Sequence, residues 1–192
     1  MYENQIITEP KWKSWIIQTT TPLFTPEQCR KIIECGRRQP PQQAKVGMGK
    51  PGGGTDTKKR ITTVSWIPFQ EMQPMYRDLD KFVQTCNENH FGFGDIRVTE
   101  NAQFTEYPEG GFYDWHMDCD VNMANEPPVR KISMTLLLND PSEFEGGHLE
   151  LMAPGKFAEL KQGHAIVFAS FLNHRVNPVT RGVRQSLVVW FG

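Results

Sequence analysis

The chain has 192 residues, of which 38% are hydrophobic and 22% are charged, and its formal net charge is −1. This length suits one domain with its own core, and the composition is that of an ordinary soluble globular protein. The near-neutral charge argues against nucleic acids and anionic membranes as partners, and no apolar run approaches the roughly 20 residues of a membrane span.

The cysteines and the N-terminus indicate the compartment. The N-terminal stretch is polar and acidic, unlike a signal peptide. The four cysteines form no CxxC pair and have no zinc-site spacing; they are Cys29, Cys35, Cys86 and Cys119. We therefore expect a cytoplasmic protein with reduced thiols.

A first helix is predicted near Thr25. Thr25 suits the N-cap, Pro26 the first helical position, and Gln28 completes a capping box. An apolar stripe follows at helical spacing: Cys29, Ile32 and Ile33. We expect Gly36, followed by Pro40, to end this helix.

Residues 45–60 are rich in glycine and charge and lack an apolar period, which predicts an exposed loop. A loop of this length is either a lid over a binding site or an inert linker. The basic run that ends it, Lys58-Lys59-Arg60, is expected to be solvated.

A strand is predicted from Ile61 to Ile67, where β-branched and aromatic residues cluster. A second helix is predicted after Pro68. Its apolar residues recur at helical spacing: Met72, Met75, Tyr76, Leu79, Phe82, Val83 and Cys86.

From residue 96 onward the pattern is that of short strands separated by Gly, Pro, Asp or Asn. The strand-like segments are 96–107, 131–139, 146–151, 164–170 and 184–192. Helices followed by such strands predict an α+β fold, a jelly roll (double-stranded β-helix) with N-terminal helices packed outside. We expect one domain over 1–192, helical to about residue 95 and β-rich from about 96.

His116 and Asp118 are the strongest candidates for metal ligands. Side chains two residues apart in an extended chain point to the same face, so both can reach one cation. His174, which follows a strand, is the expected third ligand. Two histidines and one carboxylate are the ligand set of non-heme iron(II) oxygenases, and zinc is the alternative.

Arg184 and Ser186 open the last predicted strand and share a face. An arginine fork binds a carboxylate through two hydrogen bonds, and a nearby hydroxyl assists it. This pair suits the distal carboxylate of a dicarboxylic keto acid.

At this point the chain resembles a known family. HxD, a distant histidine and a basic residue ten positions later form the pattern of the iron(II)/2-oxoglutarate-dependent dioxygenases. Two segments look like the prolyl 4-hydroxylase branch: 107–118 (YPEGGFYDWHMD) and 145–151 (EGGHLEL). A third, 174–184 (HRVNPVTRGVR), looks like the bacterial and phage hydroxylases of that branch. The resemblance covers roughly residues 60–192.

The resemblance implies Fe(II) on His116, Asp118 and His174, with 2-oxoglutarate and O2 as cosubstrates and ascorbate as a reductant. It places 2-oxoglutarate near Arg184 and Tyr107, assisted by Ser186. Some relatives use a tyrosine on the strand after the HxD motif. This chain has Thr135 in that stretch, which is expected to substitute in part.

The resemblance also implies substrate-binding roles, for Tyr113, Arg130 and Trp190. Related halogenases lack the carboxylate at the position of Asp118, so its presence favours hydroxylation. The expected reaction is hydroxylation of a prolyl residue in a protein, with translation-associated proteins among the candidates, and with the 45–60 loop closing over the peptide.

Other functions remain open from the sequence. A closed polar pocket would favour a free amino acid or another small molecule as substrate. Nucleic-acid demethylation is disfavoured by the near-neutral charge. The non-enzymatic alternative is a jelly-roll binding module with an inactive metal site.

Overall fold

The structure is a computed structural model that describes residues 14–43, 58–119, 129–153 and 159–192. Most of the loop predicted at 45–60 lies outside these ranges. Within them, none of the helices has the length and apolarity that crossing a membrane requires.

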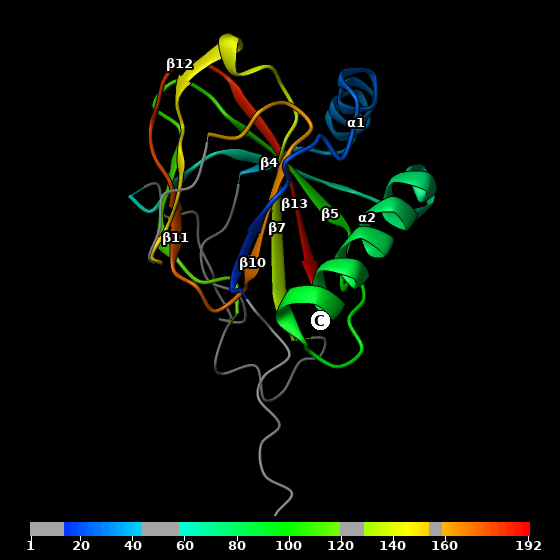
Figure 1. The fold of residues 1–192 in the computed structure, drawn as a ribbon. Coiled ribbons are helices and arrows are strands. Elements are labelled where there is room, and N and C mark those ends of the chain that lie inside the picture. Colours follow the sequence, from blue (N-terminus) through cyan, green and yellow to red (C-terminus); the bar gives the residue numbers. More distant parts are fainter. Residues whose placement is uncertain (1–13, 44–57, 120–128, 154–158) are drawn as a thin grey trace, which may run out of the picture.

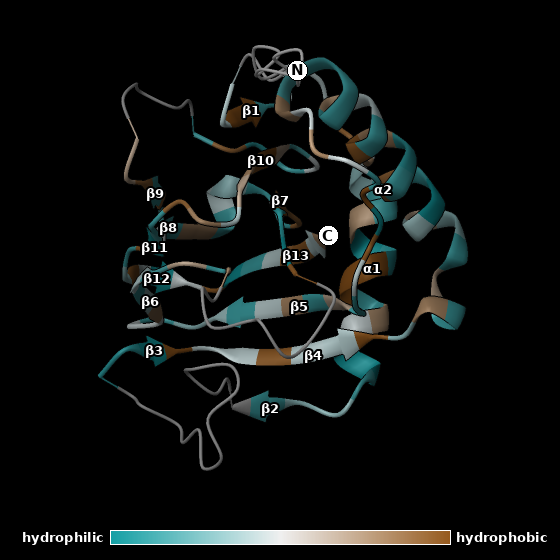
Figure 2. Cartoon of the chain, turned by 90° about the horizontal axis from the view of Figure 1, so that it is seen from below, coloured by the Kyte–Doolittle hydropathy of each residue, from teal (hydrophilic) through white to brown (hydrophobic). Residues whose placement is uncertain are grey.

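The fold has three layers: a pair of helices, a large antiparallel sheet and a smaller antiparallel sheet (Figure 1). The helices are α1 (Pro26–Arg38) and α2 (Gln73–Cys86). They cover one face of the large sheet, and the smaller sheet lies on its other side (Figure 2). This is the predicted α+β jelly roll with helices packed outside.

The large sheet has the strand order β1-β10-β7-β13-β5-β4-β2. In chain order its strands are β1 (Ile16–Gln18), β2 (Gln42–Gln43), β4 (Thr63–Ile67), β5 (Ala102–Tyr107), β7 (Ile132–Leu137), β10 (Ala165–Ala169) and β13 (Arg184–Phe191). The small sheet has the order β3-β6-β11-β9, and β12 pairs with β8. These strands are β3 (Arg60–Ile61), β6 (Phe112–His116), β8 (Phe144–Gly146), β9 (Leu149–Leu151), β11 (His174–Val176) and β12 (Val179–Gly182). Short helical turns lie at Phe69–Glu71, Asn87–Phe91 and Pro141–Glu143.

Helix α1 begins as predicted but ends later. The Thr25 side chain accepts from Gln28 N, and Gln28 reaches back to the Thr25 N–H, which completes the capping box. The prediction that Gly36 ends the helix is wrong, because the helix continues to Arg38. Glycine is needed there for packing: a Cβ at position 36 would lie 2.4 Å from Phe104 Cγ.

The apolar core lies between the helices and the large sheet. Alternate residues of each strand face it, and on β13 these are Leu187, Val189 and Phe191. The opposite, inner face of the sheet carries buried polar groups: Gln103, Thr105, Ser133, Thr135, Arg184 and Ser186. Buried polar side chains need partners, so this inner face is suited to a polar ligand rather than to dry packing.

The strand predicted over 61–67 is divided between two layers. β3 belongs to the small sheet and β4 to the large one. At the break, the Thr62 hydroxyl donates to Glu106 O at 2.8 Å. The chain therefore crosses from one sheet to the other at Thr62.

Candidate metal centre

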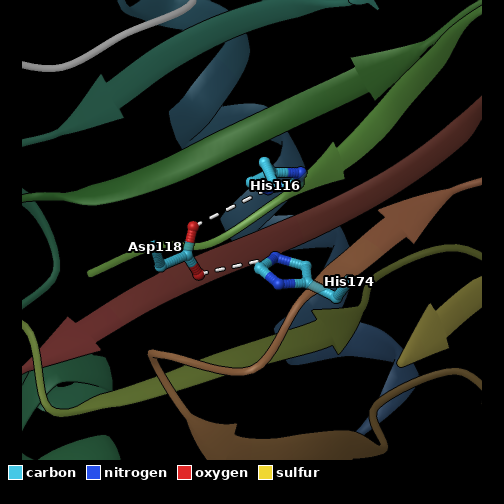
Figure 3. Close-up of side chains that lie close together, drawn as sticks. All are labelled: His116, Asp118 and His174. Atoms are coloured by element: carbon cyan, nitrogen blue, oxygen red, sulfur yellow. Dashed lines mark ion pairs between the residues drawn. The ribbon is translucent and has the colours of Figure 1, made fainter. Parts of the chain in front are cut away.

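Three side chains converge at one end of the small sheet, from segments far apart in the sequence (Figure 3). His116 is the last residue of β6 and His174 the first of β11, and the two are paired in register. Asp118 lies just beyond β6, where its backbone N–H donates to Ser170 O at 3.0 Å. The HxD segment and the distant histidine therefore meet as predicted.

The potential ligand atoms of these residues all lie within 4.8 Å of one another. His116 Nε2 is 3.7 Å from Asp118 Oδ1, and His174 Nε2 is 3.6 Å from Asp118 Oδ2. The side chains are 15% exposed for His116, 8% for Asp118 and 6% for His174. The group is thus nearly buried, which limits competition from water.

Backbone contacts determine the tautomer of both histidines. His116 Nδ1 lies 2.8 Å from Asp114 O, and His174 Nδ1 lies 3.0 Å from Leu172 O. Because a carbonyl only accepts, each Nδ1 donates a proton and each neutral ring keeps a lone pair on Nε2. Both lone pairs are therefore available on the side of Asp118. This use of the second ring nitrogen is typical of metal-binding histidines.

The electrostatics favour a cation. Burial, together with the neighbouring His174, lowers the pKa of His116 to about 3. Burial raises the pKa of Asp118, but the opposing effects of His174 and His116 prevail and the net direction is downward. Asp118 Oδ2 is buried without a hydrogen bond. An unpartnered carboxylate oxygen beside two imidazole lone pairs fits a divalent metal ion.

A second buried group lies around Arg184, at the start of β13. Arg184 Nη1 donates to Ser186 Oγ at 2.9 Å, and Ser186 Oγ is 2.6 Å from Thr105 Oγ1. The guanidinium carbon lies 5.6 Å from the centre of the Tyr107 ring. The structure thus brings together Arg184, Ser186 and Tyr107, the residues expected near 2-oxoglutarate. Thr105 was missed, although its alternation with Tyr107 on β5 places it on the same face.

Arg184 is 3% exposed, and burial lowers the pKa of its guanidinium. Among the described residues, the arginines that form ion pairs with acids are Arg37, Arg130, Arg175 and Arg181. Arg184 is therefore a buried cation without an acid of the described chain. This arrangement fits the carboxylate of a ligand.

A cavity of about 770 Å³ reaches Arg184 from the surface. The apolar part of its wall comes from three strands, β7, β9 and β10: Leu137, Leu149, Leu151 and Ile166. Glu145, Glu150 and Glu159 also line this cavity, and the first two pair with Arg181 and Arg175. The cationic end at Arg184 and the apolar part of the wall suit a dicarboxylate with a short methylene chain. Thr135 lies on β7, buried, with its Cα paired to Val188 of β13. It shares the inner face, but no contact between Thr135 and Arg184 is observed.

The predicted substrate residues lie close to the metal centre. The Tyr113 ring stacks on His116, with centroids 3.4 Å apart. Arg130 lies over the Trp190 ring at 3.6 Å and donates to Glu100 Oε1 at 2.7 Å. Trp190 faces Asp118 and contributes to lowering the pKa of that carboxyl. Because Arg130 pairs with Glu100, the charge of Arg130 is already neutralised within the chain.

One prediction about this region is wrong. Arg60, expected to be solvated with Lys58 and Lys59, is only 7% exposed. Its Nη2 donates to Gln103 Oε1 at 3.1 Å, and its guanidinium lies 4.3 Å from the Tyr113 ring centre. The sequence did not predict the burial of Arg60, because Arg60 follows two lysines and is the only one of these three residues that belongs to a strand.

Comparisons with known proteins agree with this geometry. Residues 102–192 match the model of the 2OG-Fe(II) oxygenase superfamily. A PKHD-type hydroxylase of Colwellia psychrerythraea is 43% identical over 171 residues, which is 88% of this chain and 74% of that protein. One from Stenotrophomonas maltophilia is 34% identical over 62% of this chain and 56% of its own length. The chain thus spans little more than half the length of some curated relatives.

Solved structures share the fold. A Pseudomonas putida prolyl-4-hydroxylase has a TM-score of 0.69 at 23% identity, covering 93% of this chain and 92% of its own. The viral collagen prolyl hydroxylase of Paramecium Bursaria Chlorella virus-1 has a TM-score of 0.71 at 17% identity, covering 93% and 96%. A prolyl hydroxylase from Trichoplax adhaerens, in complex with a hypoxia inducible factor peptide, has a TM-score of 0.66 at 16% identity, covering 93% and 84%.

The sequence matches support the family assignment more strongly than the structural similarity does, because the Colwellia relative is similar over most of both chains. The chain belongs to the 2OG-Fe(II) oxygenase superfamily and resembles its PKHD-type hydroxylases.

Proposed function

We propose that this protein is an Fe(II)- and 2-oxoglutarate-dependent dioxygenase that hydroxylates a prolyl residue of a peptide or protein. The observation that carries the proposal is the convergence of two Nε2 lone pairs and a buried, unpartnered Asp118 oxygen within 4.8 Å. His116, Asp118 and His174 would hold the metal and leave the remaining positions for cosubstrates.

Bound iron, 2-oxoglutarate and dioxygen supply the oxidising chemistry, which inserts one oxygen atom into a C–H bond and releases succinate and carbon dioxide. The chain binds and orients the reactants. Arg184 would hold the distal carboxylate of 2-oxoglutarate, with Ser186 fixing the guanidinium and Tyr107 packing against it. The nearly buried centre excludes water from the reaction.

The proposal of a prolyl substrate is supported by the side chains beside the metal centre and by the relatives of the chain. Tyr113 and Trp190 present aromatic surface beside the metal centre, which suits an apolar pyrrolidine ring. The structural neighbours include prolyl hydroxylases, one of them in complex with a peptide. Ascorbate is expected to sustain turnover by keeping the iron reduced.

The first test is an anaerobic visible spectrum of the protein titrated with Fe(II) and 2-oxoglutarate. Binding through the keto oxygen and a carboxylate predicts a weak charge-transfer band that requires both additions and is lost in His174→Ala. No band in folded wild-type protein at saturating additions would contradict the proposal and favour zinc chemistry or a binding module.

Substrate class is tested separately, by incubating the enzyme with proline-containing peptides and with free proline. A one-oxygen mass gain on a peptidyl proline, dependent on 2-oxoglutarate, is the expected result. A mass gain on free proline alone would mean that the protein hydroxylates a small molecule and not a peptide.

A further inference from the structure

Arg60 is a buried cation that the proposed reaction does not use. Its side chain starts in β3 of the small sheet and reaches Gln103 on β5 of the large sheet, with Nη2 3.1 Å from Gln103 Oε1. Its Nε is buried and has no hydrogen-bond acceptor. Arg60 therefore bridges the two sheets with one neutral amide as its hydrogen-bonded partner among the described residues.

This environment is unusual for a charge. Burying a guanidinium is costly unless an anion and further hydrogen bonds compensate. The described arginines that pair with acids are Arg37, Arg130, Arg175 and Arg181, so Arg60 is not among them. Arg184 shares this condition, and there a ligand carboxylate is the proposed partner.

Arg60 lies close to the metal centre, one side chain away from His116. Its guanidinium packs 4.3 Å from the Tyr113 ring centre, and Tyr113 stacks on His116 at 3.4 Å. Gln103, its partner, is four residues along β5 from Tyr107, which underlies Arg184. Four residues of a strand span about 13 Å. The two buried cations thus mark two ends of the polar inner face.

We propose that Arg60 is a specificity-determining residue that binds a carboxylate of the prime substrate. This inference rests on the proposed function and narrows its substrate class to molecules with an acidic group near the reacting carbon. The Nε–H without an acceptor and the guanidinium charge supply the donor and the field for that group. In a peptide or protein substrate this carboxylate is an acidic side chain beside proline, whereas a preference for free proline over prolinamide would mean that the substrate is a free amino acid.

The test measures binding with turnover blocked. Wild-type protein is loaded with Mn(II) and 2-oxoglutarate, and calorimetry compares matched probes. Blocked peptides carry Glu or Gln on either side of proline, and free proline is compared with prolinamide. At least one acid should bind about tenfold or more tightly than its amide. The pair that shows the preference identifies the source of the carboxylate.

Three variants then test whether Arg60 causes the preference for the acid over its amide. Arg60→Gln should abolish it, and Arg60→Lys should retain part of it through the remaining charge. Arg181→Gln is the control, since Arg181 pairs with Glu145 on an exposed edge and should keep the full preference. Circular dichroism checks the fold of each variant.

Equal binding of every acid and its amide in wild-type protein, including no measurable binding of either, overturns the inference without any variant. A preference that survives in folded Arg60→Gln also overturns it. The charge-transfer band reports separately on the proposed function, so the two failures can be distinguished.

Discussion

Each residue of the metal centre is held by a contact that the backbone provides. The carbonyls of Asp114 and Leu172 fix the two imidazoles, and Ser170 O fixes the backbone at Asp118. These acceptors are main-chain atoms, so the side chain of Asp114 does not orient the ligands. It accepts from Trp115 N instead, at 2.8 Å.

Asp118→Ala should abolish 2-oxoglutarate-dependent hydroxylation and leave the protein folded. The substitution removes a ligand and also a buried charge with an unpartnered oxygen, so the apoprotein loses no strong hydrogen bond at Oδ2. Activity is measured as succinate release, and folding by circular dichroism. The matched control is Asp78→Ala, an exposed position on α2, which should keep wild-type activity. Full activity in Asp118→Ala would remove this residue from the site.

Arg184→Gln should raise the concentration of 2-oxoglutarate that is required by about 10- to 100-fold, because charge-assisted hydrogen bonds contribute roughly 1.5–3 kcal/mol each. No acid among the described residues loses its partner, since Arg184 has none there. The requirement is measured by titrating the charge-transfer band. Arg181→Gln serves as the control. An unchanged requirement in Arg184→Gln would mean that another residue holds the distal carboxylate.

At the scale of elements, helix α1 shows where local sequence signals suffice and where they fail. The capping box lies within four residues, so it was predictable. The role of Gly36 depends on Phe104, which is distant in sequence, so glycine was misread as a helix end. The prediction of one strand over 61–67 was wrong for the same reason. The chain passes from one sheet to the other at Thr62, whose hydroxyl contacts Glu106, a residue distant in sequence.

Gly36→Ala should destabilise the protein by about 1–3 kcal/mol, although alanine favours helices, because the new methyl group overlaps the Phe104 ring. The measurement is the free energy of unfolding from urea denaturation. Gly94→Ala is the control, since a Cβ there meets nothing within 4 Å, and its effect should stay within about 0.5 kcal/mol. Equal stability of the two variants would show that Phe104 accommodates the methyl group.

For the whole molecule, the sequence predicted the layers because the helical period precedes the strand-like segments along the chain. It also predicted the three candidate ligands, since His116 and Asp118 share a local spacing. The short strands β1, β2, β11 and β12 have two to four residues, too few for an alternating pattern. The inter-sheet position of Arg60 was likewise not predictable, because it depends on how two sheets face each other.

Ligand binding should stabilise the whole fold in two separable steps. A ligand that binds only the folded chain at 100 times its Kd adds about 2.7 kcal/mol, or roughly 5–10 °C in Tm for a chain of this size. Mn(II) should give the first increase. 2-Oxoglutarate should add the second only when Mn(II) is present, because it needs both the metal and Arg184. Thermal unfolding followed by circular dichroism measures both steps.

The variants divide these steps between the two ends of the site. Asp118→Ala should lose both increases, whereas Arg184→Gln should keep the Mn(II) step and lose most of the 2-oxoglutarate step. Asp78→Ala and Arg181→Gln should show both. A 2-oxoglutarate step that persists in Asp118→Ala would mean that the keto acid binds without the metal, and the coupling between Arg184 and the metal centre would then have to be abandoned.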